Sequence, residues 1–239
     1  MLTAAARFLD RLGVSPDVLT VVGFLLMFPA GYLILEGYLM GAAVVIALAG
    51  GIDLLDGRLA RLRERRSSFG ALLDSGLDRY GDAIHLLAIA IYFMVRGEIG
   101  YMLFALSALV GAFEISYVKA RSEGLGHPCA VGFWQRPERL VLVILALGAD
   151  NLRLVILYLG VLTHVTAFER LMYARFEMKK AMERSAGGER TLWGDDIRFC
   201  HQWPPWVRSL LLDDGKRQNH AYWLKAAFFV LTILGMRLG

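Results

Sequence analysis

Long uncharged runs of mostly apolar residues most strongly limit how this 239-residue chain can fold. Residues 18–35 carry no charged side chain, and this run is close to the length that a helix needs to cross about 30 Å of hydrocarbon. Shorter uncharged runs follow at residues 37–52, 83–95, 99–113, 140–149 and 154–168. Most continue as a helical pattern into charged residues at one end, as expected for spans whose polar ends face a cavity or the membrane interface. The sequence therefore predicts an all-α integral membrane protein, a bundle of six transmembrane helices.

Composition and charge placement agree with a membrane protein. Hydrophobic residues make up 56% of the chain and the mean hydropathy is +0.49. Assigning alternate loops to opposite sides places 17 of the 26 Lys and Arg residues on one side, and the opposite loops hold only Arg96 and Arg153. The positive-inside rule then predicts a multi-pass protein of the inner (cytoplasmic) cell membrane with both termini cytoplasmic. Its basic face would attract anionic membrane lipids. Nucleic acid is not an expected partner, because no basic stripe is interleaved with aromatic residues.

The two ends of the chain differ from its apolar middle. The first 15 residues alternate Ala, Phe and Leu with charged residues, which predicts an amphipathic interfacial helix before Pro16 opens the first span. We expect residues 1–175 to form the membrane domain. Residues 176–239 are predicted to be a C-terminal cytoplasmic extension, whose apolar run at 226–236 favours a further interfacial helix over a seventh span.

Four aspartates interrupt this apolar chain: Asp53, Asp56, Asp74 and Asp78. They stand in the pattern D-x2-D-G-x2-A-R-x8-G-x3-D-x3-D, so each pair lies on one face of a helix. The short connection at residues 62–69 predicts antiparallel neighbouring helices whose carboxylates converge at the cytoplasmic end. Near the bilayer centre each uncompensated aspartate would cost about 2.5–3.5 kcal/mol. Divalent cations would compensate the charge, and hard oxygen ligands without a His or Cys cluster favour Mg²⁺ or Mn²⁺ over zinc.

Small residues between the aspartates point to a phosphate ligand. Gly57, Ala60, Gly70 and Gly76 would let a nucleotide or phosphate approach the backbone closely. Arg61 could bind its phosphates bidentately. The competing interpretation is a solvated helix end whose aspartates pair with nearby arginines. That interpretation fits an arbitrary pair of aspartates better than it fits four at this spacing.

Residues 51–78, GIDLLDGRLARLRERRSSFGALLDSGLD, resemble the signature of the CDP-alcohol phosphatidyltransferases and fill every fixed position of that pattern. The preceding SPDVLT at residues 15–20 is similar to the family's entry into its first span, with Asp17 where Asn is usual. The resemblance covers about residues 1–175. It implies transfer of a lipid phosphate group from CDP-diacylglycerol or CDP-archaeol to an alcohol, with release of CMP. It also implies two divalent ions and a homodimer.

The resemblance implies roles for individual residues. Asp53, Asp56 and Asp74 would hold the metal ions. Asp78 would touch the second ion and act as the catalytic base that takes a proton from the acceptor hydroxyl. The CDP group would be surrounded by Gly57, Ala60, Arg61, Gly70 and Ser75.

Basic residues at the cytoplasmic ends of the predicted spans bear on the identity of the acceptor. They are Lys119, Arg121, Arg136, Arg139, Arg170 and Arg175. Lys binds a phosphate as a point charge and Arg as a fork, so these cations indicate a phosphorylated acceptor. The positive-inside rule alone also predicts basic loops on this side. Each of these residues can therefore be explained either by phosphate binding or by topology.

Three short segments narrow the choice of acceptor molecule further. SYVKARSEGLG, RPERL and TAFER resemble the branch that synthesises phosphatidylinositol phosphate and archaetidylinositol phosphate. In that branch the counterparts of Lys119, Arg139 and Arg170 would grip inositol 1-phosphate. Inositol 1-phosphate is therefore the predicted acceptor, and glycerol 3-phosphate is the alternative. A divalent-cation transporter and an inactive scaffold are alternatives from other classes, although clustering of the carboxylates at one face argues against the transporter.

Overall fold

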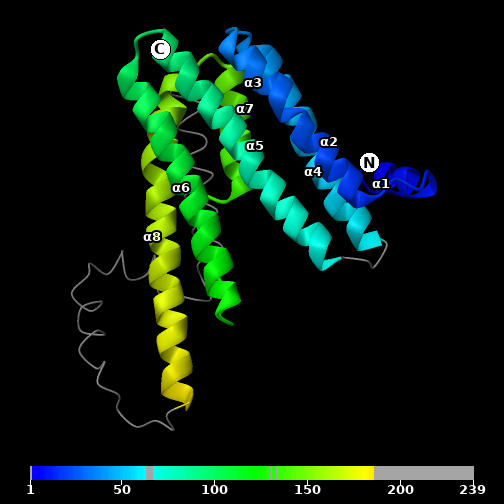
Figure 1. The fold of residues 1–239 in the computed structure, drawn as a ribbon, viewed down its shortest axis with the longest axis vertical. Helices are drawn as coiled ribbons and strands as arrows, with labels where there is room; N and C mark the ends of the chain where they lie inside the picture. The colour runs from blue at the N-terminus through cyan, green and yellow to red at the C-terminus, as the bar shows by residue number, and fades with distance from the viewer. Residues whose placement is uncertain (1, 63–66, 130, 133, 186–239) are drawn as a thin grey trace. The chain divides into compact units, whose positions relative to one another are not determined.

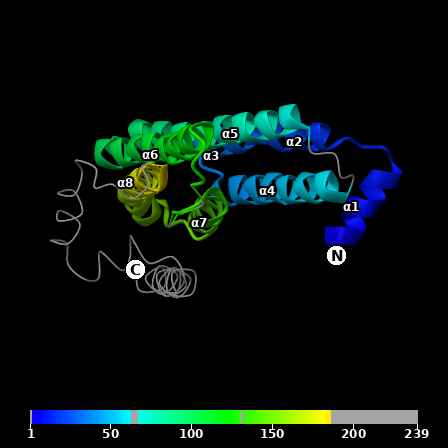
Figure 2. The ribbon, with the colours of Figure 1, turned by 90° about the horizontal axis from the view of Figure 1, so that it is seen from below.

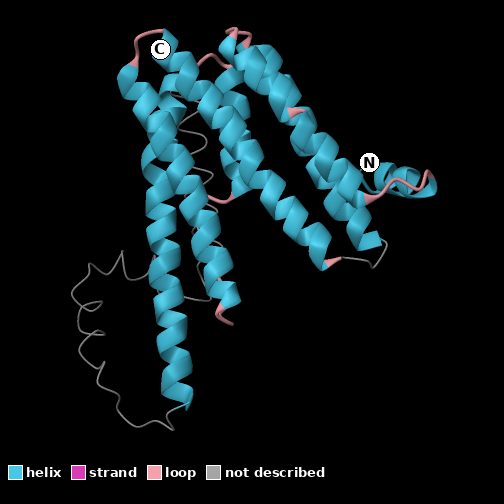
Figure 3. Ribbon diagram, in the orientation of Figure 1, coloured by secondary structure: helices cyan, strands magenta, loops and turns pink. Residues whose placement is uncertain are grey.

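The structure is a computed structural model that describes residues 2–62, 67–129, 131–132 and 134–185. Every regular element in these ranges is an α-helix, which confirms the all-α fold class for this part of the chain (Figures 1 and 3). The helices are α1 (Leu2–Arg11), α2 (Pro16–Leu25), α3 (Met27–Leu35), α4 (Leu39–Leu62), α5 (Ser68–Val95), α6 (Ile99–Gly124), α7 (Arg136–Gly148) and α8 (Leu152–Ser185).

Four segments of the described chain are long and apolar enough to cross a membrane, where the sequence predicts six. They are Pro16–Leu35, Leu39–Leu62, Ile99–Gly124 and Leu152–Met182. The other two predicted spans correspond to α5 and α7. The first half of α5 carries several charged residues, and the 13 residues of α7 extend over only about 20 Å.

The first span consists of two helices that follow one another in the same direction (Figure 1). The helices α2 and α3 meet at Leu26, whose backbone stays right-handed at φ −67° and ψ −17°. Pro29 in the first turn of α3 has no N–H to donate to the carbonyl of Leu25, so regular α-helical hydrogen bonding cannot run through this point.

The chain divides into two compact units. Unit 1 comprises Met1–Phe113 and Arg136–Leu162, and unit 2 comprises Glu114–Gln135 and the described part of Thr163–Gly239. The helix α8 reaches Ser185, ten residues beyond the predicted end of the membrane domain at residue 175. The rest of the predicted C-terminal extension, including the run at 226–236, lies outside the described residues.

In unit 1, the first span packs against two helices at once. Both α2 and α3 contact α4 and α5, and α7 also packs against α4 (Figure 2). The helices α4 and α5 run antiparallel, as predicted (Figure 1). The sequence predicted that they are direct neighbours, whereas in the structure α2 and α3 contact both of them. Gly50 permits the close approach of α7, because a Cβ there would lie 3.1 Å from Leu140 Cδ2. At the N-terminus, α1 packs against α4 through buried Ala6 and leaves Phe8 exposed.

Contacts with the first residues of α8 hold the turn between α5 and α6 and the first half of α6 in place. Arg153 donates two hydrogen bonds of 2.7 Å to the carboxylate of Glu98, in the turn between α5 and α6. These hydrogen bonds lower the pKa of Glu98. Further along, Ser107 Oγ donates to the carbonyl of Gly160 at 2.8 Å. A Cβ at Gly160 would lie 2.7 Å from Phe104 Cδ1 and 2.8 Å from Phe104 O, so only glycine fits between α6 and α8.

We predict that Gly160→Ala lowers the thermal stability of the detergent-purified protein. The added methyl group must displace the backbone of α6, an overpacking that typically costs about 1–3 kcal/mol. Gly100→Ala in α6 is the matched control, because a Cβ there meets nothing within 4 Å. Thermal unfolding of the three proteins checks this prediction, and unfolding of Gly160→Ala at the wild-type temperature would contradict it.

Candidate active site

Three of the four predicted aspartates converge in unit 1. Carboxylate oxygens of Asp53 and Asp56 from α4 and of Asp74 from α5 lie within 4.8 Å of one another. Asp56 is buried, and the other two are half-buried. Oxygens that share one divalent cation at about 2.0–2.6 Å lie no more than about 5 Å apart. The three carboxylates therefore form a group that could hold a hard divalent cation.

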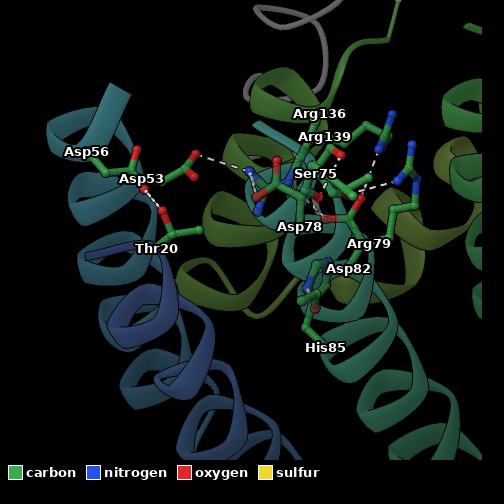
Figure 4. Close-up of polar contacts among 12 residues, drawn as sticks. Thr20, Asp53, Asp56, Ser75, Asp78, Arg79, Asp82, His85, Arg136 and Arg139 are labelled. Carbon is green, nitrogen blue, oxygen red and sulfur yellow. Dashed lines mark hydrogen bonds and ion pairs between the residues drawn. The ribbon is translucent and has the colours of Figure 1, made fainter. Parts of the chain in front are cut away.

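Asp56 is held by a residue that the sequence analysis did not assign to the site. Thr20 of α2 donates a hydrogen bond of 2.7 Å from its hydroxyl to Asp56 Oδ2 (Figure 4). This bond fixes one carboxylate of the cluster and ties α2 to α4. The sequence feature that could have identified Thr20 is its hydroxyl group, which lies about one helical turn inside an otherwise apolar run at the end of SPDVLT.

Asp78 lies outside the group of three and forms an ion pair with Arg136, the first residue of α7. Arg136 Nη1 is 2.8 Å from Asp78 Oδ1 and 3.0 Å from Asp53 Oδ2. One nitrogen of a single guanidinium group therefore bridges carboxylates from α4 and α5 (Figure 4). The sequence predicts Arg136 as a ligand of the acceptor phosphate, and the structure places it among the aspartates.

A second arginine of α7 pairs with a fifth carboxylate. Arg139 Nη2 lies 2.9 Å from Asp82 Oδ2, and both side chains are about nine-tenths buried. Arg136 Nε adds a longer contact of 3.6 Å to Asp82. The sequence analysis did not assign Asp82 to the site, although its place one turn after Asp78 on the same helical face was a usable signal. Arg79 instead donates to the carbonyl of Ser75 in its own helix, at 3.0 Å.

The residues assigned to the CDP group differ in their surroundings. A Cβ at Gly57 would meet nothing within 4 Å, so space is open beside this turn of α4. Arg61 is exposed and donates from Nε to the carbonyl of Gly57 at 3.2 Å. Ala60 is half-buried, and Ser75 donates from its hydroxyl to the carbonyl of Leu72 at 3.0 Å.

Gly70 is required by a contact within the protein. A Cβ at this position would lie 2.8 Å from Asp17 Oδ1 and 2.9 Å from Ser67 Oγ. Ser67 caps α5, since its hydroxyl oxygen accepts a hydrogen bond of 2.8 Å from the Gly70 backbone N–H. The glycine therefore lets the start of α2 approach the start of α5 at the edge of the site.

Unit 2 contains the other cations that the sequence analysis assigned to the acceptor. Lys119 is exposed and lies 3.9 Å from Glu123, while Arg121 is exposed. Arg170 is only 5% exposed and donates hydrogen bonds of 2.7 Å to the carbonyls of Val131 and Ile115. Its guanidinium thus holds the segment before α7 against the end of α6.

A pocket borders the aspartates inside unit 1. Asp53, Asp78, Arg136 and Thr20 form its polar side, and apolar residues such as Phe24 and Leu140 line much of the rest. The pocket lies among α2, α4, α5 and α7.

We predict that Arg139→Gln destabilises the protein by about 3 kcal/mol, because it leaves the buried carboxylate of Asp82 without its nearest counter-ion. The double variant Asp82→Asn/Arg139→Gln removes both charges and should recover part of the loss. Thermal unfolding of the wild type and both variants measures this coupling. A single variant as stable as the wild type, or a double variant less stable than the single one, would contradict it.

Known proteins resemble this chain over most of its length. The archaetidylinositol phosphate synthase of Methanothermobacter thermautotrophicus is 35% identical over 176 residues, which cover 71% of this chain and 88% of that protein. The phosphatidylinositol phosphate synthase of Mycobacterium tuberculosis is 31% identical. Its structure with CDP-DAG bound gives a TM-score of 0.67 and covers 72% of this chain and 92% of its own. Its complex with manganese and citrate gives 0.69, with 73% and 89% covered.

The family match extends over most of the chain. The family model described as CDP-alcohol phosphatidyltransferase matches residues 13–167, which include α2 to α7, every aspartate of the site, and both α7 arginines. The protein belongs to the CDP-alcohol phosphatidyltransferase family.

Proposed function

We propose that this protein transfers the phosphatidyl or archaetidyl group of a CDP-linked lipid to a hydroxyl of inositol 1-phosphate and releases CMP. The convergence of Asp53, Asp56 and Asp74 beside a pocket with a charged side and an apolar wall carries this proposal. The names of the relatives support an inositol phosphate as the acceptor. Membership in this enzyme family argues against the transporter hypothesis.

The proposed cofactor is a pair of Mg²⁺ or Mn²⁺ ions. Asp53, Asp56 and Asp74 would hold one ion, and Asp78 would help to hold the second. The manganese complex of the M. tuberculosis enzyme supports the use of a divalent metal. When bound, the ions supply charge neutralisation at the diphosphate and at the phosphorus under attack. Thr20 would keep Asp56 oriented as a ligand, as a group that hydrogen-bonds to a metal ligand usually does.

Asp78 is the proposed catalytic base. It lies one turn after Asp74 on α5 and borders the pocket. Its carboxylate would take the proton from the acceptor hydroxyl as the hydroxyl oxygen bonds to the lipid-linked phosphorus. The bond between this phosphorus and the bridging oxygen breaks, and CMP leaves with that oxygen.

Gly57, Ala60, Arg61, Gly70 and Ser75 remain the proposed contacts for the CDP group. The open space beside Gly57 would admit a phosphate or ribose close to the backbone of α4. Exposed Arg61 could exchange its bond to the Gly57 carbonyl for a bidentate contact to phosphate. Gly70 would act indirectly, by letting Asp17 and Ser67 close the edge of the site.

The proposed acceptor site uses Lys119, Arg121, Arg136, Arg139 and Arg170. Lys119 and Arg121 are exposed and would bind phosphate directly. The bonds that Arg170 makes to Val131 and Ile115 favour a role in holding the segment before α7.

We infer that α5 and α7 also lie in the bilayer, which gives the six-helix bundle. The charged side chains of α5 that would otherwise be costly at this depth pair with Arg136 and Arg139 of α7. The basic loops favour a cytoplasmic site in the inner membrane, with both termini on the cytoplasmic side and α1 at the interface. A homodimer is proposed on the family resemblance alone.

We predict that the purified protein releases CMP from CDP-diacylglycerol or CDP-archaeol when Mn²⁺ or Mg²⁺ and inositol 1-phosphate are present. Turnover should be slower with glycerol 3-phosphate, and EDTA should abolish it. Asp78→Asn should reduce kcat by about 10²-fold or more, because the proton acceptor is lost. Liquid chromatography of CMP and of the lipid product measures each reaction.

Lys119→Ala provides a sharper test of the acceptor site. It should raise KM for inositol 1-phosphate and leave KM for the CDP-lipid unchanged. Lys180→Ala near the end of α8 is the charge-matched control and should leave both KM values unchanged. Faster turnover of glycerol 3-phosphate would overturn the proposed acceptor. CMP release that survives Asp78→Asn at the wild-type rate would overturn the proposed base.

A further inference from the structure

Arg136 makes contacts that phosphate binding alone does not explain. Its Nη1 atom lies 2.8 Å from Asp78 Oδ1 and 3.0 Å from Asp53 Oδ2, so it touches one carboxylate of each helix that carries the signature (Figure 4). The side chain is 24% exposed and borders the pocket. A guanidinium group in this position neutralises negative charge at the centre of the site.

We propose that Arg136 is an internal counter-ion that competes with a divalent cation for Asp53 and Asp78. The guanidinium of Arg136 holds these two carboxylates together. With Asp53 and Asp78 holding a cation, Arg136 would be available to a substrate phosphate. This inference rests on the proposed use of divalent metal. It adds the order in which the metal and the anionic substrate bind.

The competition follows from the oxygen atoms involved. Asp53 contributes an oxygen to the group of three carboxylates and accepts from Arg136 through Oδ2. An oxygen that ligates a cation at about 2.0–2.6 Å turns a lone pair toward that cation, and two positive charges at one carboxylate repel each other. Asp53 and Asp78 would therefore hold a cation less tightly while Arg136 pairs with them, and Arg136 less tightly while they hold a cation.

The released guanidinium would remain at the site, because Arg136 is anchored at the first residue of α7. Asp82 does not depend on it, since Arg139 holds that carboxylate at 2.9 Å while the contact from Arg136 is 3.6 Å. Arg136 could then turn within the pocket and bind a phosphate with its two-pronged edge. Arg136 would thus join the other cations at the substrate phosphate only when Asp53 and Asp78 hold a metal, so tight binding of the anionic substrate would follow metal binding.

Mn²⁺ binding to the full-length protein without any substrate tests this proposal. Electron paramagnetic resonance of free Mn²⁺ gives the affinity and the number of bound ions. Arg136→Gln removes the competing charge and should strengthen the weaker Mn²⁺ site by about tenfold or more. Arg136→Lys keeps the charge and should stay near the wild-type affinity. Arg79→Gln is the matched control, because this neighbour of Asp78 bonds to the carbonyl of Ser75.

Thermal unfolding provides a second readout that does not depend on activity. Arg136→Gln should unfold at a lower temperature than the wild type in EDTA, because carboxylates lose their counter-ion, and saturating Mn²⁺ should close most of this gap. Equal or weaker Mn²⁺ binding by Arg136→Gln, in a wild type that binds Mn²⁺, overturns the counter-ion role alone. A wild type that binds no Mn²⁺ overturns the proposed metal use together with it.

Discussion

Crowding of like charges in an apolar helical protein is the constraint on which the site depends. Carboxylates that lie within 4.8 Å of one another repel. Arg136 and Arg139 from α7 form ion pairs with carboxylates of the site, and the hydroxyl of Thr20 from α2 donates a hydrogen bond to Asp56. The same repulsion that makes the cluster costly gives it affinity for a divalent cation.

The packing of unit 1 serves this arrangement. Since α2 and α3 contact both α4 and α5, the first span sets how the two signature helices face each other. Gly50 lets α7 lie close to α4, and Gly70 lets Asp17 reach the start of α5. Glycines in these helices therefore have different purposes. Some admit neighbouring helices, whereas Gly57 leaves open space that a ligand can use.

The sequence predicted the all-α class and the convergence of Asp53, Asp56 and Asp74, because local spacing places each pair of signature aspartates on one helical face. It did not predict the partners of these carboxylates. Thr20 is 36 residues from Asp56, and Arg139 is 57 residues from Asp82, and no local periodicity encodes such pairings. The break at Leu26 was readable in principle, since Pro29 interrupts helical hydrogen bonding.

The central claim is that the signature aspartates bind divalent cations at one end of the pocket. Anomalous diffraction at the manganese absorption edge, from crystals of the full chain grown with Mn²⁺, tests this claim most directly. The account predicts a strong peak within ligand distance of Asp53, Asp56 and Asp74, and loss of that peak in Asp56→Asn. A strong peak elsewhere with none among these three carboxylates would contradict it.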